Sequence, residues 1–283
     1  MGPGIECGTG RRAGGVVRVD FLALFGIGLL TGLTTVLFGF GGGFVAVPVV
    51  MWADAALGAD AMRVATATSA LVMVVNAAFA TAVTPRRVLA ALRGSGPLLL
   101  LLAAGASAGA LLARHAPPGP VRWAFVLYVA LTVVDLLLRP GFLRPSAPSG
   151  PAHDAPRPLP AVVGAPVGAV AAFLGVGGSV MTVPAMRRAG HSMRVATSLA
   201  NPLTLAIALP AALVFLGGAE GPAAAHGHAR LVGLVDVAAA TALLLGALPV
   251  IAVLRRRPPR IPDRVHAWTY IALLGAVTVA MVL

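Results

Sequence analysis

The chain has 283 residues, of which 58% are hydrophobic and 11% are charged, against roughly 25% charged in an average soluble domain. This composition excludes a soluble globule and a disordered chain, and the single cysteine, Cys7, excludes a disulfide-rich scaffold. The net charge is +12 and all 21 basic residues are arginine. Because these arginines occupy short gaps between apolar runs, they indicate a membrane protein and argue against nucleic-acid binding.

Eight apolar segments follow an N-terminal tail of residues 1–19. We expect no cleavable signal peptide, because the first apolar run is too long for one. Each segment is long enough to cross a bilayer at roughly 20 residues per span, and the absence of a two-residue alternation predicts helices instead of barrel strands. The predicted segments are Phe21 to Met51, Val64 to Val83, Pro97 to Ala113, Trp123 to Leu138, Leu159 to Met186, Val195 to Leu216, Val235 to Leu254 and Val265 to Leu283.

A proline-rich linker, residues 139–158, divides the chain near its midpoint and predicts two membrane units, residues 20–138 and 159–283. The two units share three matches in the same order, which predicts two homologous repeats of four segments each. The matched stretches are Gly39 to Pro48 with Gly175 to Pro184, Met62 to Thr66 with Met193 to Thr197, and Gly105 to Arg114 with Gly246 to Arg255.

Arginine counts in the connections predict that the two repeats are inverted. The three internal loops of the first repeat carry one, three and two arginines, whereas those of the second carry three, one and five. By the positive-inside rule, opposite phases place the halves upside down relative to each other. Inversion requires an odd number of crossings in each half, so the first and fifth segments would have to fold back. The arginines of the tail argue against this for the first segment.

The glycine-rich stretches at the start of the two repeats are the most informative motifs. Several glycines and a proline within ten residues should interrupt a membrane helix, and the freed amides would favour an anion. The alternative is that these glycines only allow close helix packing. The candidate binding residues in the two stretches are Gly39, Gly41, Gly42, Gly43 and Pro48, and Gly175, Gly177, Gly178, Ser179 and Pro184.

These stretches, GFGGGFVAVP followed by VATATS and GVGGSVMTVP followed by VATSLA, resemble the TauE/SafE sulfite exporter family of membrane permeases, also called the sulfonate uptake permease group. The resemblance covers nearly the whole chain after the tail. It implies two four-helix repeats and transport of a sulfur-containing anion such as sulfite or a sulfonate. Ser179, which stands where the first repeat has Gly43, puts strict symmetry of the two stretches in doubt.

Polar residues just after the glycine-rich stretches form a second candidate set. Arg63 and Arg194 occupy equivalent positions and fit either an oxyanion ligand or an anchor at the membrane interface. The hydroxyl and amide groups that follow could face the substrate or bond back to their own helices. These residues are Thr66, Thr68, Ser69, Thr197, Ser198 and Asn201.

Two acidic residues lie at the edges of apolar runs. Asp135 precedes Arg139 by four residues, which predicts a local ion pair. Asp236 opens the seventh segment and is either a proton- or cation-coupling residue or a helix N-cap.

Together these features predict an all-α, multi-pass protein of the plasma membrane that carries a small anion by alternating access as a secondary transporter. An uncoupled anion channel is the first alternative, and a membrane enzyme or assembly factor is the second. No enzyme, cofactor or metal site is expected, since Ser179 lacks the nucleophile frame, His226 and His228 lack further ligands, and the chain has no lysine for a Walker motif. The expected partners are the anion, the lipid bilayer and a coupling proton or cation, with no nucleic acid; the sequence predicts no oligomeric state.

Overall fold

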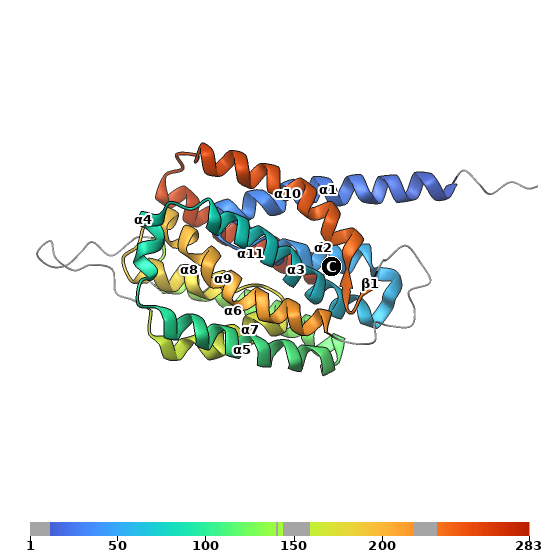
Figure 1. The fold of residues 1–283 in the computed structure, drawn as a ribbon, viewed down its shortest axis with the longest axis horizontal. Helices are drawn as coiled ribbons and strands as arrows, with labels where there is room; N and C mark the ends of the chain where they lie inside the picture. Colours follow the sequence, from blue (N-terminus) through green and yellow to red (C-terminus); the bar gives the residue numbers. More distant parts are fainter. Residues whose placement is uncertain (1–11, 140, 144–158, 218–230, 283) are drawn as a thin grey trace, which may run out of the picture.

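The computed structural model describes residues 12–139, 141–143, 159–217 and 231–282, and these are almost entirely helical (Figure 1). Seven helices are long and apolar enough to cross a membrane, which confirms an all-α membrane protein. The elements are α1 (Arg12–Phe38), α2 (Gly43–Ala53), η1 (Ala55–Asp60), α3 (Ala61–Ala82), α4 (Arg86–Leu89), η2 (Ala90–Leu92), α5 (Gly96–His115), α6 (Pro118–Leu138), η3 (Ala161–Val163), α7 (Gly164–Leu174), α8 (Ser179–Arg188), α9 (Met193–Leu216), β1 (Leu231–Val232), β2 (Val235–Asp236), α10 (Val237–Arg256) and α11 (Asp263–Val282).

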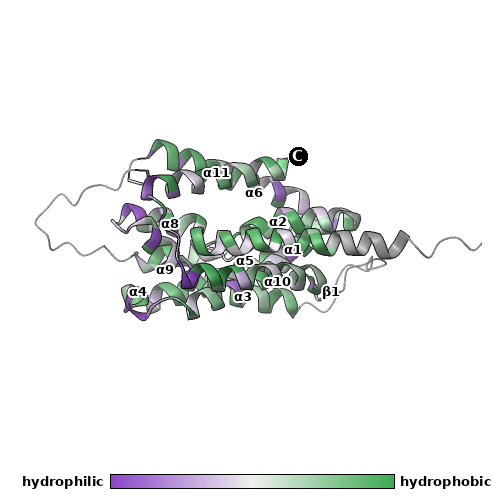
Figure 2. Ribbon diagram, turned by 90° about the horizontal axis from the view of Figure 1, so that it is seen from above, coloured by the Kyte–Doolittle hydropathy of each residue, from purple (hydrophilic) through white to green (hydrophobic). Residues whose placement is uncertain are grey.

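Large apolar side chains cover the outside of the long helices. Leu100 on α5 is 73% exposed and Leu138 on α6 is 76% exposed, an arrangement that would be costly in water and is expected in lipid. Figure 2 shows hydrophilic residues gathered at the helix ends, most of them where α4 and α8 lie. This distribution is that of a bundle that spans the bilayer along the helix direction.

The bundle has two ends, which we name by their features. The ladder end holds the antiparallel strands β1 and β2. These strands lie beside the start of α3, where the hydroxyl of Thr68 accepts a hydrogen bond from the amide of Asp236. They also lie beside the end of α9, where the amide of Leu234 donates to the Phe215 carbonyl oxygen. At the opposite end, which we call the vestibule end, a cavity is lined by residues that follow α3 and residues that begin α9. α3 and α9 are therefore antiparallel.

Two helical hairpins enter the bundle from opposite ends. α1 runs alongside α10 from the ladder end, and α2 returns the chain to that end, where Asp54 meets Asp236. α7 runs inward from the vestibule end alongside α5, and α8 returns there, where Arg187 pairs with Asp263. Three helices in each half of the chain, namely α3, α5 and α6, and α9, α10 and α11, run between the two ends.

These chain directions are those expected of two upside-down halves whose first segment folds back. The first segment thus folds back, although the tail arginines argued against this. α1 already begins at Arg12, within the stretch expected as a tail. The duplication itself stays a prediction. The chain expected as a single first segment is divided into α1 and α2, and the single fifth segment is divided into α7 and α8.

Candidate functional site

Both glycine-rich stretches interrupt the helix, as the motif predicted. α1 ends at Phe38 and α2 begins at Gly43, and between them Gly39, Gly41 and Gly42 have φ values of 75°, 64° and 84°. In the second half, Gly175 and Gly177 between α7 and α8 both have a φ of 70°. Side chains other than glycine rarely adopt this left-handed conformation, so the residue type at these positions sets the break.

The two breaks cross at the centre of the bundle, between Met73 of α3 and Thr204 of α9. A Cβ atom on Gly41 would lie 3.0 Å from the Thr204 methyl group, and one on Gly177 would lie 3.0 Å from the Met73 sulfur and 3.4 Å from the Phe40 carbonyl oxygen. Met73 and Thr204 are equivalent positions in the predicted repeat, 131 residues apart like Met62 and Met193. The glycines therefore permit both the break and the close packing that the sequence offered as alternatives.

Side chains from other helices bind the carbonyl groups that the breaks set free. The Thr204 hydroxyl donates to the Gly39 carbonyl oxygen at 3.3 Å, and the Ser69 hydroxyl donates to the Gly175 carbonyl oxygen at 3.1 Å. His266 Nε2 donates to the Leu37 carbonyl oxygen near the end of α1, which assigns the ring proton to Nε2 because a carbonyl only accepts. Each break is thus held by a helix of the other half.

Asn76 is a polar residue beside the first break that the sequence did not single out. Its side chain is 0% exposed, and neither its oxygen nor its nitrogen has a hydrogen-bond partner among the described residues. A Cβ on Gly42, the N-cap of α2, would lie 2.7 Å from Asn76 Nδ2. The first amides of α2 have no partner within the helix. The equivalent residue beside Gly178 is Ile207, so only the first break carries this amide.

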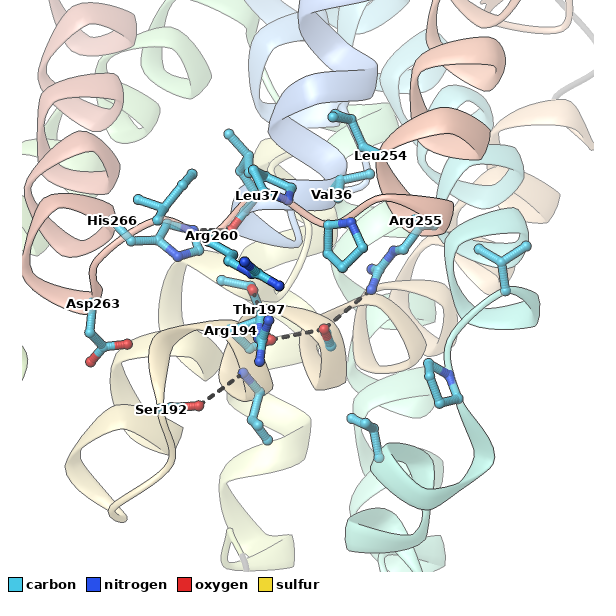
Figure 3. A pocket seen from close by; sticks show the side chains of 18 of the residues that line it. Val36, Leu37, Ser192, Arg194, Thr197, Leu254, Arg255, Arg260, Asp263 and His266 are labelled. Carbon is cyan, nitrogen blue, oxygen red and sulfur yellow. Dashed lines mark hydrogen bonds between the residues drawn. The ribbon is translucent and has the colours of Figure 1, made fainter.

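A cavity of about 900 Å³ opens at the vestibule end, between the tip of the α1–α2 hairpin and the facing ends of α9 and α10 (Figure 3). Its cationic side chains are Arg87, Arg194, Arg255 and Arg260, and its walls include Leu37, Val195 and Leu254. Asp263 is the acidic residue of its lining. The Asp263 carboxylate is bound by the Arg187 guanidinium and by the Met193 amide, the latter at 2.9 Å, so the free charge of the cavity is positive.

Arg255 is the arginine of this cavity that has buried nitrogens without a hydrogen-bond partner among the described residues. Its Nη1 donates to the Ser198 hydroxyl at 3.2 Å, and that hydroxyl donates to the Arg194 carbonyl oxygen at 2.8 Å (Figure 3). Its Nε and Nη2 atoms are buried and have no hydrogen-bond partner among the described residues. A buried charge without a partner is costly, and these two nitrogens form the edge of the fork that binds two oxygens of one oxyanion. The site therefore combines a cavity large enough for an anion with an arginine whose donors are only partly bound.

Three residues of the predicted site line this cavity, namely Arg194, Thr197 and Ser198. Thr197 and Ser198 both donate to the Arg194 carbonyl oxygen, and Asn201 Nδ2 donates to the Thr197 carbonyl oxygen at 3.2 Å. The back-bonding that the sequence offered for these residues is therefore present. The sequence analysis did not predict a site role for Arg255, although its match with Arg114 in the predicted repeat is a signal that could have selected it.

The remaining predicted residues lie away from the cavity. Arg63 is at the ladder end, where it donates to the Ala116 carbonyl oxygen at 3.0 and 3.3 Å and pairs with Asp60 at 3.4 Å. Thr66 donates to the carbonyl oxygen of its own helix at Met62. Pro48 and Pro184 lie inside α2 and α8, and the break glycines are buried. The structure thus divides the predicted site between the two ends and the centre.

The ladder end is closed beside Arg63, although a second cavity of about 490 Å³ opens at this end beside Trp52 and Arg122. The space beside Arg63 is only about 10 Å³ and is lined by residues that include Phe173 and Phe215. Arg114, the match of Arg255, donates to the Val214 carbonyl oxygen at 3.4 Å. The cationic residues of the two ends thus have the same predicted origin but different surroundings, because the large cavity adjoins Arg255 and not Arg114.

The acidic residues also have defined places. Asp135 pairs with Arg139 at 3.0 Å, as predicted, and also with Arg188 at 2.6 Å. Asp236 is the N-cap of α10, where its Oδ1 accepts from the amides of Ala238 and Ala239 at 2.8 and 3.0 Å. His226 and His228 lie outside the described residues.

Crossed helix breaks, exposed apolar helices and a cationic cavity at one end define a multi-pass membrane protein of the transporter class. The sequence model of the family described as "Sulfite exporter TauE/SafE" matches residues 24–281, and the chain belongs to this family. No curated protein and no solved structure matches the chain. The family is one of membrane transporters of sulfite or related anions.

Proposed function

We propose that the protein is a secondary transporter of a small sulfur-containing oxyanion, sulfite or an organosulfonate. The observation that supports this best is Arg255, which lines the cavity with three further arginines and has two buried nitrogens without a hydrogen-bond partner among the described residues. Sulfite and sulfonates present two or three oxygens on one centre, which matches the two parallel N–H donors of that edge. The apolar walls at Leu37, Val195 and Leu254 suit the carbon chain of a sulfonate.

The central break is the next position on the proposed path. The α2 N-terminus carries partial positive charge, and Asn76 supplies a buried amide that can donate to an oxyanion. An anion released from Arg255 would meet these donors once the hairpin tips separate. Arg63 and Arg114 would then receive it at the ladder end, in a conformation with that end open and the vestibule closed.

We propose that the vestibule end faces the cytoplasm of a cell whose plasma membrane holds the protein. The arginine-rich runs at residues 86–93, 187–194 and 255–264 all lie at this end, and short cytoplasmic loops are enriched in arginine. The cavity would then load anions from the cytoplasm. In this account the chain performs no catalysis, because its polar residues bind and release the anion without forming a bond to it.

Counterflow in proteoliposomes tests the proposal. Vesicles preloaded with unlabelled sulfite or ethanesulfonate should accumulate the labelled anion transiently, and its uptake should saturate. Continuous current in planar bilayers without counterflow would instead identify a channel, and the absence of both, for every sulfur oxyanion tested, would refute the proposed function.

A further inference from the structure

Asp54 and Asp236 form a buried carboxyl pair at the ladder end, far from the arginines of the cavity. Asp54 is the C-cap of α2, in the connection to α3, and is 8% exposed; Asp236, the N-cap of α10, is 5% exposed. The two carboxyl groups lie close enough for Asp236 to act directly on Asp54. Asp54 Oδ2 is buried and has no hydrogen-bond partner among the described residues. Two carboxylates cannot both remain ionised at such a distance without a large cost.

We propose that this pair is a proton-binding site, in which Asp54 carries the proton while the ladder end is closed and donates it in a hydrogen bond to Asp236. The proposal deepens the transport function proposed above, because it names the coupling ion and the residue that binds it. It extends the sequence hypothesis for Asp236, which is both the N-cap and the acceptor of the pair.

The two helix termini decide which carboxyl group holds the proton. Asp236 Oδ1 accepts two amides at the start of α10, where the positive end of the helix dipole favours a negative charge. Asp54 lies at the end of α2, where the negative end of the dipole opposes one, and although it also precedes η1, its side chain binds no amide of η1. Burial, followed by the charge of Asp236 and the hydrogen bond with it, raises the pKa of Asp54 to about 7.

Other charged groups at this end are occupied elsewhere. On the described parts of the elements packed around Asp54, these groups are Asp60 on η1, Arg63 on α3 and Arg122 on α6. Arg63 bonds Asp60 and the Ala116 carbonyl oxygen, and Arg122 bonds the carbonyl oxygens of Met281 and Val282. Neither arginine forms an ion pair with Asp54 in the described part of the chain, so no cation there replaces the proton.

The position of Asp54 links the proton to the conformation. α2 carries the anion-facing amides at one end and Asp54 at the other. When the ladder end opens, water reaches Asp54 and its pKa should fall towards its ordinary value near 3.8. Between pH 4 and 7 the closed form therefore holds a proton that the open form has lost. Raising the pH over this window favours opening by up to tenfold per pH unit, and the effect levels off above about pH 7.

Infrared titration of the purified full-length protein tests the site without any substrate. The wild type should show a protonated-carboxyl band that disappears around pH 7, Asp54→Asn should lack that band, and Asp236→Asn should move its titration to lower pH. Asp60→Asn, a matched control six residues further on, should leave it unchanged. A neutral-pH band that persists in Asp54→Asn, or no such band in the wild type, would overturn the proposal. Because Asp236→Asn tests the same pair, failure of one variant to fold leaves the test intact.

Thiol labelling then tests the link to opening. In a chain with Cys7→Ser and Phe215→Cys, labelling at the closed ladder end should rise with pH between 4 and 7 and become flat when Asp54→Asn is added. Equal pH dependence with and without Asp54→Asn would overturn the link. Both readouts are independent of anion transport. If the carboxyl group titrates as expected but the protein shows no counterflow, the proposed transport function is refuted and the proton site is still supported.

Discussion

Replacing Arg255 with glutamine should abolish high-affinity anion binding without unfolding the protein. The substitution removes the Nε and Nη2 donors, which have no hydrogen-bond partner among the described residues, and the charge that accompanies them. A bond to a charged group contributes about 1.5–3 kcal/mol when both partners are present. The loss of a two-point contact should therefore weaken binding by about 3 kcal/mol, which corresponds to a dissociation constant roughly 150-fold higher.

The same substitution should leave the stability of the empty protein unchanged or raise it. In the wild type without anion, a buried guanidinium edge is desolvated without compensation, a cost that glutamine lacks. Arg255→Lys keeps the charge but loses the planar fork, so its affinity should fall between those of wild type and Arg255→Gln. Arg256→Gln, at the exposed neighbouring position outside the cavity lining, is the matched control and should bind like wild type.

Thermal unfolding in detergent, with and without sulfite or ethanesulfonate, measures both quantities. At 100 times its dissociation constant the anion should stabilise wild type and Arg256→Gln by about 2.7 kcal/mol. Arg255→Gln should show a much smaller shift from an equal or higher starting temperature. An unchanged anion shift in Arg255→Gln would refute the assignment of this edge as the ligand, and a lower starting temperature would refute the argument from desolvation.

Three further substitutions test the breaks and the packing. The Gly42→Val protein should insert into the membrane normally but lose counterflow. The φ of 84° at this position costs a side chain about 1–2 kcal/mol, and the new Cβ would lie 2.7 Å from Asn76 Nδ2. Full counterflow would contradict this prediction. Asn76→Ile, which copies Ile207, should retain thermal stability and reduce the counterflow rate at least tenfold; an unchanged rate would exclude Asn76 from the path. Gly105→Val should lower the unfolding temperature by forcing α5 from the Ala165 carbonyl, whereas Gly119→Ala, which meets open space, should not.

The sequence predicted the features that depend on local chemistry. A run of glycines breaks a helix wherever it lies, so the break after Phe38 and the break after Leu174 followed directly from residue type. The sequence does not decide the side on which α1 begins, because the tail arginines and the predicted inverted repeat favour opposite sides. The packing of α1 along α10 and the return of α2 resolve its direction, and neither contact can be read from one segment alone.

The most informative site residues depended on contacts between distant segments. In the sequence Arg255 is one of several loop arginines. Its distinction is that Ser198, on another helix, binds only part of its guanidinium group, and this contact depends on the fold. Asn76 had no neighbour in the sequence that marked it, and its place beside Gly42 comes from the fold of the hairpin. The proton-binding role proposed for Asp54 depends on its contact with Asp236, which lies in the other half of the chain.

A structure of the protein with bromoethanesulfonate tests the central claim most directly, because the anomalous signal of bromine locates the bound anion. We expect the bromine in the vestibule cavity, with sulfonate oxygens on Nε and Nη2 of Arg255 and beside Ser198. A bound anion at any other place, or a saturated complex in which the Arg255 edge still has no partner, would contradict the account.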